Sequence, residues 1–270
     1  MRPLLALVSI LTLARPALPD DRLNSVAWMQ TSVEYRAASL GAFRLAARML
    51  EIAVKDRKWS AALEQTEPFG KLPPAVILDA DETVLDNSPF QARMIRSGVE
   101  FQPPMWDQWV RENKADAVPG AVEFCRLAAG RGVSVFFITN REHTQEEATR
   151  RNLERLGFPL AASPVDAVLT RGEKPDWTTD KGSRRRAVAE RYRILLVVGD
   201  DLGDFLSGVR VSPEARAALA RAHQDRWGSR WIMIPNPAYG SWEDALFGHD
   251  RSLSPEEKGR RKLAALREAQ

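Results

Sequence analysis

Short apolar runs alternate with stretches of helical spacing along most of this 270-residue chain, and this alternation limits the fold more than any other feature. The expected strands occupy residues 75–78, 133–138, 165–169, 194–198 and 231–234. The expected helices between them occupy residues 119–129, 144–156, 181–193 and 213–224. Strands that alternate with helices form a mostly parallel sheet with helices on both faces. The sequence therefore predicts an α/β fold with a doubly wound, mostly parallel sheet.

Three further segments flank or interrupt this pattern. Apolar residues recur at helical spacing over about 25–55, which predicts one long helix or two in succession. Residues 86–118 mix polar and aromatic side chains with a pair of prolines, and we interpret them as an insertion. The last segment, 251–270, is charged and is expected to form a C-terminal helix.

The N-terminus has the pattern of a secretory signal. Arg2 is followed by a run without charge from Pro3 to Ala14, and then by Arg15. The run is too short to span a bilayer, but its length fits the apolar region of a signal peptide. The alternative is a buried first helix of the mature domain. We expect a signal peptide and linker over residues 1–20, and a periplasmic or secreted protein.

Composition excludes several classes of site. The lone cysteine, Cys125, rules out an internal disulfide framework and a zinc site made only of cysteines, and none lies where a lipid anchor would be attached. No later stretch is long enough for a membrane span, so no stable membrane anchor is expected. The formal net charge of +3 gives no reason to expect a nucleic acid polymer as partner.

Polar residues follow three of the expected strands, at the edge where open α/β sheets bind their ligands. They are Asp79 and Asp81 after the first strand, Thr139 and Asn140 after the second, and Asp200, Asp201 and Asp204 after the fourth. Lys181 begins the helix that precedes the fourth strand. Each group alone could be a turn, a helix cap or an exposed helix residue. Their joint order favours a functional site.

The residue types in these groups indicate phosphate chemistry. Several carboxylates cannot all ionise in one cleft without a cation, and oxygen ligands beside a phosphate suit Mg²⁺. Lys181 and that ion would neutralise a phosphate. A carboxylate can attack phosphorus and form an aspartyl-phosphate, and a second carboxyl can protonate the leaving oxygen. Alternation along a strand lets Asp79 and Asp81 face the same side.

These motifs resemble those of the haloacid dehalogenase superfamily of phosphotransferases. Residues 75–89 resemble the first motif of bacterial class C acid phosphatases, a group that includes lipoprotein 5′-nucleotidases. Other matching stretches are 28–36, 106–109, 118–124, 197–205 and 235–242. The resemblance implies a phosphatase domain over 21–250 with a small helical cap, formed by the N-terminal helix and the insertion at about 21–70 and 86–118.

The resemblance also implies roles for the acidic residues. Asp79 would be the nucleophile and a metal ligand. Asp81 would be the general acid and base, with its backbone carbonyl on the metal. Asp200 would complete the protein ligands of Mg²⁺, and Asp201 or Asp204 would lie behind them. Asp201 stands where the family commonly has asparagine, which adds a charge near the metal.

The remaining roles concern the substrate. Three residues would bind the phosphate: Thr139, Asn140 and Lys181. In the family, aromatic residues flank a nucleobase, and Trp106 or Trp109 and Tyr239 occupy matching positions. For Trp109, packing in the core is an equally good explanation.

The resemblance implies a secreted, magnesium-dependent acid phosphatase that acts on small phosphomonoesters. Nucleoside 5′-monophosphates are the expected substrates, and sugar phosphates or other small phosphomonoesters are the alternative within enzymes. A different class, an envelope protein that binds nucleotides without turnover, has no need of the nucleophile Asp79. The sequence leaves a homodimer open.

Overall fold

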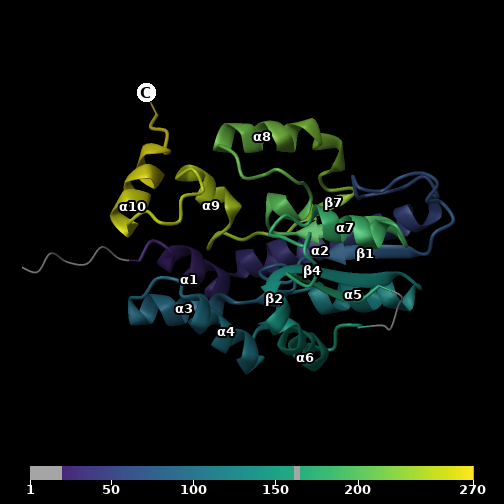
Figure 1. Ribbon diagram of the computed structural model, residues 1–270, viewed down its shortest axis with the longest axis horizontal. Helices are drawn as coiled ribbons and strands as arrows, with labels where there is room; N and C mark the ends of the chain where they lie inside the picture. Colours follow the sequence, from purple (N-terminus) through teal and green to yellow (C-terminus); the bar gives the residue numbers. More distant parts are fainter. Residues whose placement is uncertain (1–19, 161–164, 270) are drawn as a thin grey trace, which may run out of the picture.

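The computed structural model describes residues 20–160 and 165–269, so the predicted signal peptide and linker lie almost entirely outside the described residues (Figure 1). Five parallel strands form the central sheet in the order β5-β4-β1-β6-β7. They are β1 (Pro74–Leu78), β4 (Ser134–Glu142), β5 (Val168–Arg171), β6 (Arg193–Gly199) and β7 (Trp231–Met233). The chain moves outward from β1 through β4 to β5, and then returns to the other side of β1. The predicted parallel sheet is confirmed.

Both faces of the sheet are covered because the middle of each long strand is apolar. All seven residues of β6 are buried. In β1, Val76 and Leu78 pack into one core, whereas Ala75 and Ile77 pack into the core on the opposite face. This is the pattern expected of a parallel sheet that helices cover on both sides.

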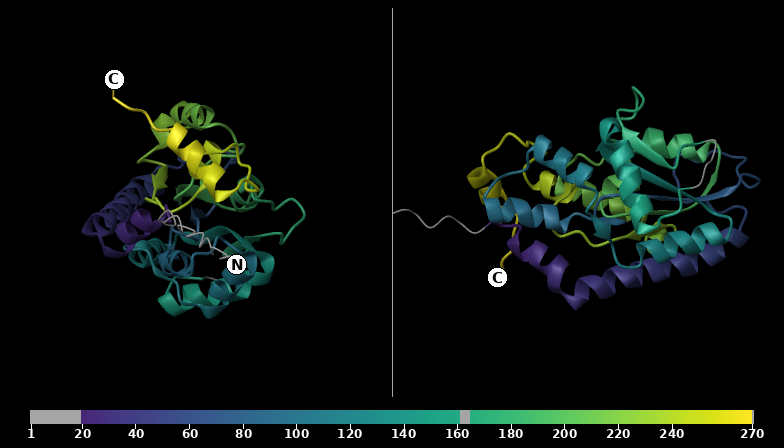
Figure 2. Two further views of the ribbon diagram at one scale, coloured as in Figure 1. Left: turned by 90° about the vertical axis from the view of Figure 1, so that its left-hand side faces the viewer. Right: turned by 90° about the horizontal axis from the view of Figure 1, so that it is seen from below.

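Helices form a layer on each face (Figures 1 and 2). The first core includes residues of α2 (Val33–Lys55), α5 (Ala121–Gly130) and α6 (Glu146–Leu156). The second core includes residues of α7 (Gly182–Ala189), and α8 (Pro213–Ala222) packs against it. The predicted doubly wound arrangement is therefore confirmed.

The N-terminal helix and the insertion, the two segments predicted to form a cap, contact each other. The insertion holds α3 (Ser88–Ser97), α4 (Pro103–Glu112) and a small antiparallel pair of β2 (Leu85–Asp86) with β3 (Asp116–Ala117). The first helix, α1 (Leu23–Thr31), packs against α3.

The long helix α2 belongs to both parts of the molecule. Near its start, Tyr35 packs with Val26 and Met29 of α1, whereas Phe43 and Leu50 join the core of the sheet. Figure 2 shows α2 extending from α1 along the face that α5 also covers. The predicted cap segment at about 21–70 thus includes a helix that packs largely on the sheet.

The remaining elements are short. The 3-10 helices are η1 (His143–Gln145), η2 (Leu202–Asp204) and η3 (Gln224–Arg226), and the last α-helices are α9 (Ser241–Leu246) and α10 (Pro255–Ala264). The sequence did not predict α9, and the helix predicted over 181–193 ends at Ala189. No helix in the described ranges is both long and apolar enough to cross a bilayer.

Candidate active site at the carboxyl edge of the sheet

Three carboxylates meet where β1 and β6 end. Asp79 follows β1, Asp200 follows β6, and Asp204 is the last residue of η2. One oxygen from each lies within 4.8 Å of the others. The Lys181 ammonium contacts Asp79 and donates a 2.6 Å hydrogen bond to Asp204 Oδ1. Asp79, Lys181 and Asp204 are 8%, 5% and 6% exposed. Asp79, Asp200, Asp204 and Lys181 therefore form one cluster, in which Asp200 is half-buried and the other three are buried.

This cluster has more negative than positive charge. Burial raises the pKa of Asp79 to about 7, with Asp204 and Asp81 adding to the rise and Lys181 opposing it. Burial also raises the pKa of Asp200 well above its usual value. Burial opposes the charged form of Lys181, but the carboxylates of Asp204 and Asp79 outweigh it and raise the pKa of the amine. Closely spaced carboxylate oxygens are the donors that a hard divalent cation prefers, so the three acids fit such an ion.

The loop after β6 gives its two further aspartates different positions. Asp204 Oδ2 accepts a 2.9 Å bond from the Asp201 amide, and its other oxygen accepts the bond from Lys181. The Asp201 carboxylate instead accepts bonds of 2.7 Å from the Ser241 amide and 2.8 Å from the Gly203 amide. The prediction set both aspartates behind the metal ligands. In the structure Asp204 lies among the clustered carboxylates, and Asp201 anchors the start of α9.

Two side chains orient Asp200. Thr83 Oγ1 donates a 2.7 Å bond to Asp200 Oδ1, and Asn236 Nδ2 donates a 2.9 Å bond to Oδ2. The sequence analysis missed both. Thr83 lies within the acidic segment after β1, which was its only signal, and Asn236 lies in the segment after β7.

Asp81 forms an ion pair with Arg141 that was not predicted from the sequence. Arg141, which is buried, donates bonds of 2.8 Å and 3.0 Å to Asp81 Oδ1 through Nη2 and Nε. Asn87 Nδ2 donates a third bond of 2.9 Å to the same oxygen. The signal for Arg141 was its place directly after the polar pair Thr139 and Asn140.

The two predicted phosphate ligands on β4 differ in their surroundings. Thr139 is fully buried, and its hydroxyl lies 3.4 Å from Asp81 Oδ2. Asn140 is exposed, and its amide donates a 3.0 Å bond to the Thr179 carbonyl. The structure thus brings Thr139 to Asp81, whereas the Asn140 side chain is bound to the loop before α7.

The predicted aromatic residues divide in the same way. Trp109 is 2% exposed and packs in the first core, and its Nε1 donates a 2.8 Å bond to Asn87 Oδ1. Trp106 is half-buried with its ring 5.4 Å from the Arg141 guanidinium carbon. Tyr239 is half-buried, and its hydroxyl donates to Glu82. Of the two tryptophans, Trp106 is the one beside the Asp81 ion pair.

Glu82 is a further buried acid that the sequence analysis overlooked. Its side chain is fully buried, and its backbone has a φ of 60°. Burial raises the pKa of Glu82 well above its usual value. Besides Tyr239, the Asn87 amide donates a 2.9 Å bond to its carboxylate. Glu82 therefore links the loop after β1 to the segment after β7.

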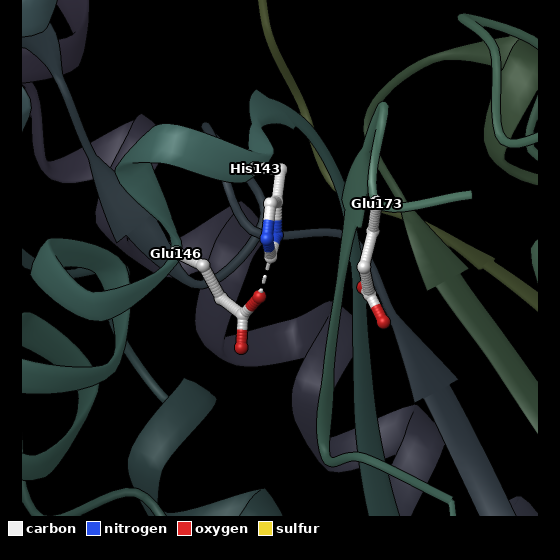
Figure 3. A group of neighbouring side chains, drawn as sticks. All are labelled: His143, Glu146 and Glu173. Carbon is white, nitrogen blue, oxygen red and sulfur yellow. Dashed lines mark hydrogen bonds and ion pairs between the residues drawn. The ribbon is translucent and has the colours of Figure 1, made fainter. Parts of the chain in front are cut away.

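A second group of potential metal ligands lies on the surface. His143, Glu146 and Glu173 point toward one another near the ends of β4 and β5 (Figure 3). His143 is exposed, and its Nδ1 lies 3.1 Å from Glu146 Oε2. Arg150 donates a 3.0 Å bond to the other oxygen of Glu146. The buried cluster with its lysine is thus the better candidate for an active site.

Comparison with known proteins agrees with this geometry. The family model described as HAD superfamily, subfamily IIIB (acid phosphatase) matches residues 19–242. The chain belongs to this acid phosphatase family. The family and the fold predicted from the motifs are thereby confirmed. The family is one of phosphomonoester hydrolases, as predicted.

Individual relatives of this subfamily IIIB chain include solved structures. Two structures of the class C acid phosphatase from Bacillus anthracis, one with tungstate bound, are 32% identical with TM-scores of 0.80 and 0.81. They cover 92% and 94% of this chain, and the matches span 98% and 99% of theirs.

Curated plant relatives match over shorter segments. The stem 28 kDa glycoprotein of Glycine max is 23% identical over 60% of this chain and 58% of its own length. Acid phosphatase 1 of Solanum lycopersicum is 31% identical over 48% of this chain and 51% of its own length. The chain therefore spans somewhat more than half the length of these curated relatives.

The close approach of Asp204 to the end of β6 generates a prediction. A methyl group at Gly199 would overlap the Asp204 side chain. Gly199→Ala should therefore displace Asp204 and weaken Mg²⁺ binding at least about tenfold, because each lost charged contact is worth roughly 1.5–3 kcal/mol. Titration calorimetry with Mg²⁺ measures this.

Gly41→Ala is the matched control, because a methyl group at Gly41 in α2 meets nothing within 4 Å. It should leave Mg²⁺ affinity unchanged. Wild-type affinity in a folded Gly199→Ala protein would show that the position of Asp204 is irrelevant to the cation.

Proposed function

We propose that this protein is a secreted, magnesium-dependent acid phosphatase that hydrolyses nucleoside 5′-monophosphates through an aspartyl-phosphate on Asp79. The observation that carries the proposal is the buried contact of Lys181 with Asp79 and Asp204 at the strand ends. A buried carboxylate beside a lysine, with two more carboxylates nearby, is suited to receive a phosphoryl group.

In the first step, an Asp79 oxygen would attack phosphorus. A bond forms between that oxygen and phosphorus, and the bond from phosphorus to the ester oxygen breaks. The leaving oxygen takes a proton from the Asp81 carboxyl. Lys181 and the Thr139 hydroxyl would hold the phosphoryl oxygens. Asn140, which follows Thr139 on β4, is proposed as a further ligand.

In the second step, water would release the phosphate. The Asp81 carboxylate takes a proton from the water as its oxygen attacks phosphorus, and the bond to Asp79 breaks. Inorganic phosphate leaves, Asp79 is again a carboxylate, and Asp81 is again protonated. Arg141 and Asn87 fix the orientation of Asp81 for both proton transfers.

Mg²⁺ is the proposed cation because hard oxygen donors beside a phosphate favour it. Asp79, Asp200 and the backbone carbonyl of Asp81 would hold it, and Asp204, with its oxygens beside theirs, would add negative charge. When bound, the ion would offset the excess negative charge of the acids and polarise the phosphate.

The proposed substrate class rests on two aromatic rings beside the acidic residues. Trp106 lies over Arg141, whose guanidinium binds Asp81, and Tyr239 is bonded to Glu82 next to Asp81. Half-buried rings at these places could stack on a nucleobase. Sugar phosphates are the alternative substrates, with no stacking needed. A binding protein without turnover is the alternative outside enzymes.

The N-terminal pattern supports export to the periplasm or beyond, with residues 21–250 as the mature phosphatase domain and 251–270 as an appended charged segment. The small-molecule substrate is the proposed partner. We propose neither a nucleic acid polymer nor a membrane anchor as a partner, and a homodimer stays open.

Replacing the nucleophile tests the proposal. Asp79→Asn should lower kcat on p-nitrophenyl phosphate with Mg²⁺ at least about a thousandfold, because an amide is a poor nucleophile at phosphorus. The fold should persist, since the change removes one charge from a cluster with excess negative charge. Asp225→Asn, at an exposed aspartate, is the control and should keep full activity. Retention of more than a few per cent of kcat by Asp79→Asn would exclude the covalent mechanism.

The role of Tyr239 is tested with two substrates. Tyr239→Ala should lower kcat/KM on a nucleoside 5′-monophosphate about 5- to 150-fold, which corresponds to about 1–3 kcal/mol of lost stacking. The kcat/KM on glycerol phosphate should be nearly unaffected, because only the nucleotide has a base to stack. Tyr239→Phe keeps the ring but loses the bond to Glu82, and should retain nucleotide activity. An equal loss on both substrates would mean that Tyr239 only supports the loop.

A further inference from the structure

Two consecutive arginines on α7 are buried beneath the candidate active site. Arg184 and Arg185 are 0% and 1% exposed, whereas the next residue, Arg186, is exposed. They follow Lys181 by three and four residues, so all three side chains project from the first turns of one helix. A buried guanidinium is costly unless its N–H groups find acceptors. The acceptors of these two arginines therefore show what their burial achieves.

Arg184 binds the last part of β4 and the loop before α7. Its Nη1 donates to the Thr139 carbonyl, and its Nη2 donates bonds of 2.6 Å to Asn140 Oδ1 and 2.7 Å to the Thr178 carbonyl. All three acceptors are neutral oxygens. Burial lowers the pKa of Arg184 to about 10, which Asp79 opposes. This cation thus holds both proposed phosphate ligands of β4.

Arg185 binds the loop that follows β6. Its Nη1 donates bonds of 3.1 Å to the Gly203 carbonyl and 2.9 Å to the Asp204 carbonyl. Its Nε and Nη2 donate bonds of 3.0 Å and 2.7 Å to Glu64, which lies outside that loop. Arg185 thus fixes the backbone that carries the Asp204 carboxylate.

The two arginines reach different segments because successive residues on a helix point about 100° apart. The strands β4 and β6 are the two neighbours of β1, and Leu78, just before Asp79, pairs with Phe137 of β4 and Val198 of β6. Side chains at the start of one helix therefore contact three chain segments: Lys181 contacts Asp79 after β1, Arg184 binds the last part of β4, and Arg185 binds the loop after β6.

We propose that Arg184 and Arg185 are positioning residues with separate tasks. Arg184 positions the proposed phosphate ligands at the end of β4, and Arg185 positions the loop after β6 that carries Asp204. The assignment rests on the proposed function. It predicts that the two residues affect different ligands, although they are adjacent and equally buried. A purely structural role would affect both ligands alike.

The test compares three lysine variants of the full chain, Arg184→Lys, Arg185→Lys and Arg186→Lys. Lysine keeps the charge but lacks the planar fork of donors, so a single ammonium cannot reach all the acceptors that the guanidinium binds. Calorimetry gives the Kd of Mg²⁺ alone, and then the Kd of inorganic phosphate at saturating Mg²⁺. Both are binding constants and do not depend on turnover.

Arg184→Lys should weaken phosphate binding about tenfold or more, since a lost hydrogen bond to a charged group is worth about a factor of ten. It should change Mg²⁺ affinity less than about threefold. Arg185→Lys should weaken Mg²⁺ binding about tenfold or more. Its phosphate affinity at saturating Mg²⁺ should change less than about threefold. Arg186→Lys should change neither constant.

Glu64→Gln separates positioning from stability, because it removes the charge of the Glu64–Arg185 ion pair and leaves the bonds of Arg185 to the Gly203 and Asp204 carbonyls in place. It should lower the melting temperature and leave Mg²⁺ affinity unchanged. If a lysine variant does not fold, the glutamine variant at that position, which keeps one amide donor, takes its place.

The division of tasks would be overturned if the Arg184 and Arg185 variants each changed the Mg²⁺ and phosphate constants equally, or changed neither constant. This outcome applies when the wild-type chain binds both ligands. A wild-type chain that binds neither Mg²⁺ nor phosphate would overturn the proposed function as well.

Discussion

The contact of one buried ammonium, Lys181, with two buried carboxylates is the interaction on which the rest of the site depends. It joins Asp79 to Asp204, yet it offsets only part of the charge, because an Asp200 oxygen lies within 4.8 Å of both carboxylates. Burial makes this excess costly and raises the pKa of Asp79 and Asp200. A divalent cation would offset this excess and, with Lys181, would attract a phosphate to the carboxylates, which is why the cluster fits phosphoryl transfer better than a purely structural role.

The fold provides this cluster through its strand order. With β4 and β6 on either side of β1, three chain segments end at one point of the carboxyl edge, where the direction of winding reverses. The apolar strands form the core that supports that edge. Lys181 and Arg184, at the start of α7, contact Asp79 and the Thr139 carbonyl there. The insertion contributes from the other side, since Asn87 contacts both Asp81 and Glu82.

Sequence patterns were sufficient to predict the sheet and the aspartates of the site, because the carboxyl ends of parallel strands lie at one edge of the sheet. They could not separate Asp201 from Asp204, which depends on the turn at η2 and on the absence of a side chain at Gly199. They also missed the ion pair of Arg141 with Asp81, since pairing across strands depends on register and rotamer rather than on spacing. The short helix α9, with six residues, was too brief to show a periodic pattern.

The central claim is that the buried acids at the ends of β1 and β6 form the cation and phosphate site. A crystal structure grown with Mg²⁺ and tungstate tests it most directly. We expect Mg²⁺ on the carboxylates of Asp79 and Asp200, and the oxyanion within hydrogen-bond distance of Thr139 and Lys181. Mg²⁺ bound instead at His143, Glu146 and Glu173, with no cation or oxyanion at the buried acids, would contradict the claim.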